Sequence, residues 1–221
     1  MCIRDRYMKG GAHVRPFERM QFLRGPQNLY YDIAYQPKEF FRLRDMLHEF
    51  FLREMDMLAC TDVDGVAFMD DWGSNNSLLI SPAAWRELFK PLYRDYCEIA
   101  HEHGKHVWFH TDGHTAAIWP DLIEVGIDVL NSQLFTMDIE ELGCLYKGRI
   151  CIYGEIDRQH VLPFGSQEEC RQAVRRVRRA LESREGGAIC TFEWGKSDPS
   201  ENALAICEEW ARPLEESIGG A

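Results

Sequence analysis

The sequence lacks the patterns that would assign it at once to several common classes of protein. Its eight cysteines are scattered and include no CxxC pair, so we expect small buried or half-buried thiols rather than disulfides. No GxGxxG or GxxxxGK[ST] motif occurs, which argues against a dinucleotide-binding or P-loop site. No stretch approaches the roughly 20 apolar residues of a membrane span, and the start has no apolar signal-peptide core. We therefore expect a cytoplasmic protein with reduced cysteines.

Positive charge is also scarce. The chain carries 25 Lys and Arg against 36 Asp and Glu, a formal net charge of −11. Phosphate backbones and anionic membrane surfaces would repel it on average, so neither nucleic acid nor a membrane is an expected partner. A small-molecule substrate fits this balance better. The 221 residues, 45% of them hydrophobic, are enough to bury one sizeable core.

Apolar runs alternate with helical patterns along most of the chain. Apolar residues at helical spacing predict a long helix over residues 37–58, and Ser81 with Pro82 predicts the capped start of another that reaches about His103. The other predicted helices lie near 115–125, 138–146, 166–184 and 199–212, and five apolar strands end near 70, 112, 133, 157 and 193. Such alternation predicts an α/β fold with a parallel sheet.

Each predicted strand ends in polar or ionisable side chains, namely Asp70, Asp71, His110, Asp112, Asn131, Gln133, Glu155, Asp157 and Glu193. In α/β folds the carboxyl ends of parallel strands form the active-site edge. His110 and Asp112 are alternate residues, so both can face the site, whereas the adjacent Asp70 and Asp71 face opposite ways and only one should point into it.

Several segments resemble the uroporphyrinogen decarboxylase superfamily, in consistent order from about residue 14 to 212. They are "DDWGSNNSLLISPAAWRELFKPLYRD", "HVWFHTDG", "PDLIEVGIDVLN", "YGEIDRQHVLPFGSQEE" and "SDPSENALAICEEW". The resemblance implies a (β/α)8 TIM barrel, of which five C-terminal βα units would be present and about three N-terminal units missing. The opening "MCIRDR" resembles a translated sequencing-adapter end, so we expect residues 1–7 to be an artefact and residues 8–221 to form the partial barrel domain.

The resemblance also implies a candidate metal site. Metal-dependent members of the superfamily carry a His-x-Cys motif at one strand end and a further Cys near the last strand. Here the corresponding positions read His110, Asp112 and, within a residue or two, Glu193, with Cys190 as a competitor for the last place. One imidazole and two carboxylates suit a divalent metal, with zinc, iron and manganese as the candidates. The alternative is a mutual ion pair that holds the loops without metal.

The remaining polar strand ends are candidates for substrate chemistry. Asp70, Asp71 and Glu155 are candidate catalytic acids or bases, and the alternative for the aspartates is a cap or salt bridge in the loop. The candidate substrate-binding residues are Trp72, Asn131, Gln133, Asp157 and Arg158. A tryptophan in such a loop more often packs than binds. The basic run from Arg171 to Arg184 reads as a solvated helix face.

By resemblance, two activities are open. The first is metal-dependent methyl transfer that involves a small methylated compound, with a corrinoid protein as candidate partner. The second is decarboxylation of uroporphyrinogen in porphyrin biosynthesis, a lyase reaction that needs no metal or other cofactor. From a different class, a noncatalytic protein that binds a corrinoid or a metabolite remains an alternative. We favour the methyltransferase-like enzyme, because a metal-ligand trio would be unnecessary for decarboxylation.

Overall fold

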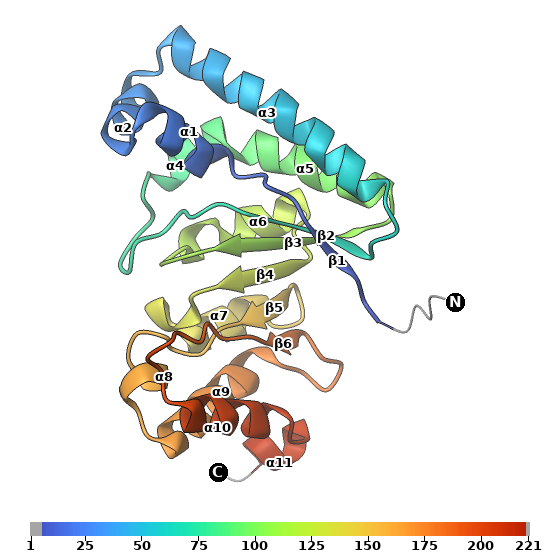
Figure 1. Cartoon of the computed structure of the whole chain (residues 1–221), viewed down its shortest axis with the longest axis vertical. Coiled ribbons are helices and arrows are strands. Elements are labelled where there is room, and N and C mark those ends of the chain that lie inside the picture. The colour runs from blue at the N-terminus through green and yellow to red at the C-terminus, as the bar shows by residue number, and fades with distance from the viewer. Residues whose placement is uncertain (1–5, 220–221) are drawn as a thin grey trace. The chain divides into compact units, whose positions relative to one another are not determined.

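The computed structural model describes residues 6–219, so most of the adapter-like stretch lies outside the described residues. The chain divides into two compact units, residues 1–129 and 130–221. In both units, strands alternate with helices along the chain (Figure 1). Within the described residues, no helix is both long and apolar enough to cross a membrane.

The strands of the first unit form a parallel ladder in the order β1, β2, β3. β1 is Lys9–Gly11, β2 is Gly65–Met69 and β3 is His106–Thr111. β1 was not predicted, because the sequence "KGG" carries no apolar pattern. In the register between β2 and β3, Met69 lies opposite His110. The residues that follow both strands therefore emerge side by side at the same edge.

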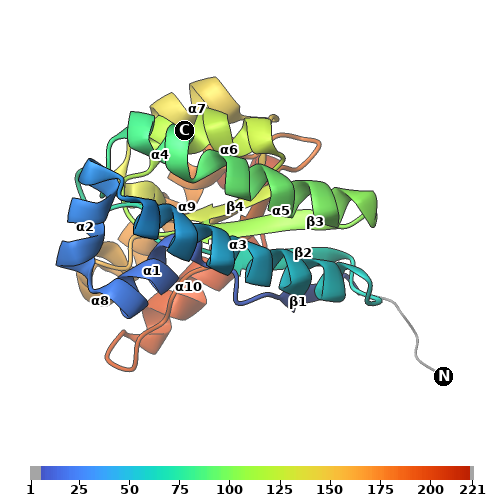
Figure 2. The ribbon, with the colours of Figure 1, turned by 90° about the horizontal axis from the view of Figure 1, so that it is seen from above.

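Helices cover this ladder. They are α1 (Pro16–Arg24), α2 (Pro26–Tyr35), α3 (Lys38–Ala59), α4 (Pro82–Leu88), α5 (Lys90–Glu102), the short 3-10 helix η1 (Ala116–Ile118) and α6 (Trp119–Val125). The long helix predicted over 37–58 is confirmed as α3, and α3 packs against α5 (Figure 2). Phe51, Met55 and Ala59 are among the α3 residues that bury the apolar face.

The prediction of a single helix from Pro82 to about His103 was wrong, because two helices, α4 and α5, lie in this segment. The Ser81 side chain caps α4 by accepting from the Ala84 N–H at 3.1 Å, as predicted. The break follows at Phe89, whose φ of −121° is not helical. Pro91 explains it, since proline has no N–H to donate to the Glu87 carbonyl four residues earlier, which interrupts the hydrogen bonds of one continuous helix. At the first turn of α5 the same proline costs nothing.

The second unit continues the alternation. Its elements are β4 (Val129–Ser132, which starts at the unit boundary), η2 (Leu134–Thr136), α7 (Ile139–Tyr146), β5 (Cys151–Gly154), α8 (Val161–Phe164), α9 (Gln167–Leu181), β6 (Ala188–Cys190), α10 (Ser200–Trp210) and α11 (Leu214–Ile218). β5 pairs with β6 in parallel. The fold is therefore α/β with parallel strands, as predicted, and its serial βα units are those of a partial (β/α)8 barrel.

The basic helix α9 has the predicted amphipathic character, with one exception. Val174, Val177 and Leu181 face inward and are at most 1% exposed. Ser166 and Glu169 form a capping box at its start. Arg178, however, is buried, where its guanidinium pairs with Glu182 and donates to backbone carbonyls near the end of α10. This arginine is thus part of the packing between α9 and α10.

Candidate functional site

Three ionisable side chains meet where β2 and β3 end. The Nε2 atom of His110 lies 3.6 Å from Asp71 Oδ1 and 3.6 Å from Asp112 Oδ1. One ligand atom of each of the three side chains lies within 4.8 Å of the other two. All three residues are partly exposed, although the Asp112 Oδ1 atom itself is buried. The sequence predicted that His110 and Asp112 lie together. Because adjacent strand residues face opposite sides, it also predicted that only one of Asp70 and Asp71 faces the same site.

Backbone geometry holds this cluster in place. The Asp70 N–H donates to the His110 carbonyl at 3.0 Å, and the Asp112 N–H donates to Asp71 Oδ1 at 3.0 Å. Because the β2–β3 ladder is parallel and in register, the two loops leave the sheet together. The Asp71 carboxylate is consequently fixed by a main-chain hydrogen bond from the loop after β3.

Two glycines allow the loops to touch. The Gly73 N–H donates to the Asp112 carbonyl at 3.0 Å, and the His114 N–H donates to the Ser74 carbonyl at 2.7 Å. Gly113 has a φ of +81°, and a Cβ there would lie 2.6 Å from the Ser74 oxygen. A Cβ at Gly73 would lie 2.6 Å from the His114 nitrogen. No other residue type could cross this closely, so the glycines set the spacing of the cluster.

Glu18 is a site residue that sequence reasoning missed. It lies near the start of α1, about 50 residues before the strands that carry the cluster. Its Oε2 atom is buried, accepts no hydrogen bond from any described residue, and lies 3.8 Å from Arg15 Nη1. Burial raises the pKa of Glu18, the Asp71 carboxylate raises it further, and Arg15 and His110 lower it. No local pattern marks this glutamate, because only the packing of α1 brings it here.

Asp70 faces the other way and caps α1. It is fully buried, and its carboxylate accepts the N–H groups of Phe17 and Glu18, each at 2.8 Å. The Tyr93 hydroxyl donates a third hydrogen bond at 2.8 Å. Burial raises the pKa of Asp70 to about 8, although these three donors lower it. The cap interpretation left open by the sequence therefore describes Asp70, which positions Glu18 rather than facing the cluster.

Trp72 lies in the core beneath the site. Its side chain is fully buried and stacks on Phe17 with ring centroids 4.2 Å apart. Its indole N–H donates to the Tyr93 hydroxyl at 2.8 Å, and that hydroxyl donates to Asp70. Burial holds the pKa of Tyr93 well above its usual value, so the hydroxyl keeps the proton it donates. The packing alternative thus describes Trp72, whose ring does not reach the surface.

The second unit has a polar group of its own at the ends of β4 and β5. Asn131 donates to the Tyr153 carbonyl at 2.7 Å and to Glu155 Oε1 at 3.4 Å. Arg158 lies 3.8 Å from Glu155 and forms a short ion pair with Glu193, whose side chain is 68% exposed. Four of the predicted site residues are therefore brought together. A metal-binding role for Glu193 stays a prediction, as do the roles of Asn131, Glu155 and Arg158.

Two further predicted substrate residues have local structural partners. The Asp157 carboxylate accepts the N–H groups of Gln159 and His160, each at 2.9 Å, which shapes the turn before α8. Gln133 is nearly buried, and its backbone carbonyl accepts a hydrogen bond from the hydroxyl of Thr136, the last residue of η2. Substrate contacts for both remain predictions.

The residues of the first cluster suit a divalent metal. A tetrahedral site with metal–ligand bonds of about 2.0–2.1 Å has ligand-to-ligand edges of about 3.4 Å. The two N···O distances of 3.6 Å are close to that value. The carboxylates of Asp71 and Asp112 face the same imidazole, and the charge of Asp71 also acts on Glu18, so a cation would relieve repulsion among these acidic groups. The oxygen and nitrogen donors fit zinc, iron or manganese.

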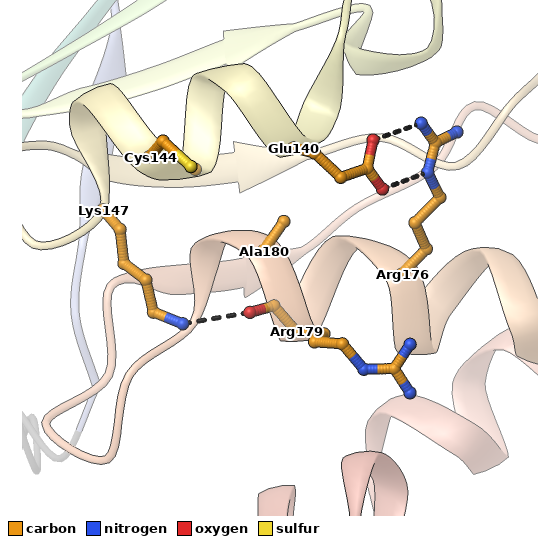
Figure 3. Close-up of a pocket in the computed structure, with 7 residues that line it drawn as sticks. Glu140, Cys144, Lys147, Arg176, Arg179 and Ala180 are labelled. Atoms are coloured by element: carbon orange, nitrogen blue, oxygen red, sulfur yellow. Dashed lines mark hydrogen bonds and ion pairs between the residues drawn. The ribbon is translucent and has the colours of Figure 1, made fainter. Parts of the chain in front are cut away.

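Two pockets lie away from the cluster atoms. One of about 490 Å³ is lined by residues 76–82, His114 and Ala117, which belong to the segments that follow β2 and β3 and include the start of α4 and part of η1. The other, of about 420 Å³, lies between α7 and α9 (Figure 3). In the second, Arg176 makes two hydrogen bonds to Glu140, and Lys147 donates to the Arg179 carbonyl. The loop pocket follows the strands that carry the cluster, which makes it the better candidate for a substrate.

Comparison with known proteins identifies relatives of this architecture. The family model described as uroporphyrinogen decarboxylase (URO-D) matches residues 5–193. A solved methyltransferase from Methanosarcina mazei matches with a TM-score of 0.73 and 15% identity, over 94% of this chain and 59% of that one. The likeness shows a shared fold, and this chain spans less than two thirds of that protein's length. No protein in the comparison with curated proteins matches.

Proposed function

This chain belongs to the uroporphyrinogen decarboxylase family, and we propose that it contributes to a metal-dependent, cytoplasmic methyltransferase-like enzyme. The methyl donor would be a small methylated compound or a corrinoid carried by a partner protein. The cluster of Asp71, His110 and Asp112 carries this proposal. A solved protein named as a methyltransferase has the same fold, so the fold is compatible with methyl transfer.

In the proposed site, Asp71, His110 and Asp112 hold the metal. When bound, the metal supplies Lewis-acid chemistry and a fixed point at which an acceptor is oriented. The hydrogen bond from the Asp112 N–H to Asp71 fixes one carboxylate before any ligand arrives. The close approach of Gly73 and Gly113 then keeps the loops from separating. Preorganisation of this kind lowers the cost of orienting a substrate.

Glu18 is the proposed proton donor. In transfer from a methylated compound, the bond from carbon to the donor atom breaks, its electron pair stays on that atom, and a new bond forms between the methyl carbon and the acceptor. The departing atom then needs a proton. Its Oε2 atom is buried and accepts no hydrogen bond from any described residue, so it is placed to hold and release a proton, and burial raises the pKa of Glu18 in the metal-free chain. Asp70 positions the helix start from which Glu18 projects.

A metal-binding experiment tests this proposal first. The full chain, without an affinity tag, is freed of metal with a chelator and titrated with Zn²⁺, Fe²⁺ or Mn²⁺ by calorimetry. We expect His110→Ala and Asp112→Asn each to abolish one binding event. His101→Ala is the matched control, since His101 pairs with Asp128 at 2.9 Å away from the cluster and should leave that event unchanged.

A turnover experiment decides the reaction class. Methylated amines, methylated thiols and a methylated corrinoid are offered with a thiol acceptor, and the methylated product is measured by mass spectrometry. We expect transfer that His110→Ala abolishes. Metal-independent conversion of uroporphyrinogen with release of CO₂, unaffected by His110→Ala, would establish the decarboxylase instead. Metabolite binding without any turnover would favour the noncatalytic alternative.

A further inference from the structure

A second group of metal-ligating side chains lies at the opposite end of the same strands. Asp56 is in the last turn of α3, Cys60 caps the end of α3, and His103 caps the end of α5. All three residues are exposed, and one ligand atom of each lies within 4.8 Å of the other two. Neither the family resemblance nor any sequence spacing pointed to them, since Cys60 and His103 are 43 residues apart.

The geometry is that of ligands around one point. The Nε2 atom of His103 lies 3.8 Å from Cys60 Sγ and 3.3 Å from Asp56 Oδ1. Both partners approach the same ring nitrogen, whereas a nucleophile relay would place the thiol and the carboxylate at opposite nitrogens. In a tetrahedral zinc site, bonds of about 2.3 Å to sulfur and about 2.0–2.1 Å to nitrogen and oxygen give edges of about 3.6 Å for S···N and 3.4 Å for N···O. The observed distances match both edges.

Two helix ends add to the attraction for a cation. α3 has 22 residues and α5 has 13, and each ends at this cluster with a capping ligand. The carboxyl end of a helix carries partial negative charge, so two such ends favour a bound cation. α3 and α5 pack against each other, so the ligands stand on elements whose separation is already set (Figure 2). The ammonium group of Lys105, two residues after His103, donates a hydrogen bond to the Val63 carbonyl at 2.9 Å.

We propose that Asp56, Cys60 and His103 bind a zinc ion that ties the end of α3 to the end of α5. A thiolate, an imidazole and a carboxylate form a donor set that suits zinc, with water in the fourth position. The site is separate from the cluster at His110, because the residues that join them span β3, and six strand residues cover about 20 Å. Zinc binding would stabilise the first unit by mass action.

Cobalt substitution separates this site from the one at His110. Co²⁺ bound to a thiolate gives a charge-transfer absorption in the near ultraviolet, which a site of oxygen and nitrogen ligands does not give. The metal-free full chain is titrated with Co²⁺ under reducing conditions. We expect the band to appear in the wild type and in His110→Ala, and to disappear in Cys60→Ser. Cys144→Ser is the control, since Cys144 is also exposed but belongs to no ligand group among the described residues.

The ligand roles of the other two residues are tested by affinity. We expect His103→Ala and Asp56→Asn each to weaken Zn²⁺ binding to the thiolate-containing site by at least about tenfold, since even indirect supports of metal ligands cost that much. Zn²⁺ should raise the melting temperature of the wild type and of His110→Ala, but not that of Cys60→Ser. A cobalt–thiolate band that persists in Cys60→Ser, or one that never appears in the folded wild type, would overturn the proposal.

Discussion

The glycine contact between the two site loops gives the sharpest test of the geometry. Gly113→Ala places a methyl group 2.6 Å from the Ser74 oxygen, and closer still to the Gly73 carbonyl, in a segment with φ of +81°. The left-handed conformation alone costs about 1–2 kcal/mol for a non-glycine residue. Separating the loops would also break the hydrogen bonds from Gly73 to Asp112 and from His114 to Ser74, worth about 1 kcal/mol each. The expected loss of unfolding free energy is about 3–4 kcal/mol.

Comparison with Gly104→Ala isolates the part of the stability loss that is due to close contact between the loops. Gly104 lies in the same unit, has a φ of +68°, and a Cβ there would meet no atom within 4 Å. Its substitution should therefore cost only the conformational strain, about 1–2 kcal/mol. Both variants are compared with the wild type by equilibrium urea unfolding in the presence of a chelator. Equal losses for the two variants, at unchanged urea dependence, would refute the idea that close loop contact sets the site.

Three further predictions concern buried and exposed groups of the same structure. Asp70→Ala should lower the unfolding free energy by about 3 kcal/mol, since two N–H groups and a hydroxyl lose their acceptor. Asp138 is an exposed cap with one hydrogen bond, so Asp138→Ala should lower it by only about 1 kcal/mol in the same urea assay. The pKa of Asp70 is raised from 3.8 to about 8, so the folded state holds this proton more tightly than the unfolded state does. The unfolding free energy should therefore fall as pH rises from 4 to 8, by at most about 1.4 kcal/mol per pH unit. Asp70→Asn should remove that slope. A thiol reagent followed by peptide mapping should label the exposed Cys60, Cys144 and Cys207 before Cys97, whose burial raises its pKa; early labelling of Cys97 would contradict its placement.

The sequence allowed the strand ends to be predicted because their signals are local. Alternation along an extended chain placed His110 and Asp112 on one face and separated Asp70 from Asp71, which the structure bears out. The break at Phe89 was missed although Pro91 was visible, since the apolar spacing continues across it. Glu18 could not be found, because a helix packed from about 50 residues away supplies it. The same holds for Cys60 and His103, which tertiary packing alone brings together.

The cap on α1 also has a consequence for the order of folding. Arg15, the residue at the N-cap position of α1, makes no capping hydrogen bond with its side chain. The acceptor comes from Asp70 instead, 53 residues beyond Phe17 in the chain. A nine-residue helix is marginal by itself, so α1 gains its start only after β2 and the loop behind it are in place. Closing that loop raises the contact order of the unit and delays α1 relative to α3, which can form from local contacts. We therefore expect the helix that carries Glu18 to become ordered only after β2 and the loop behind it.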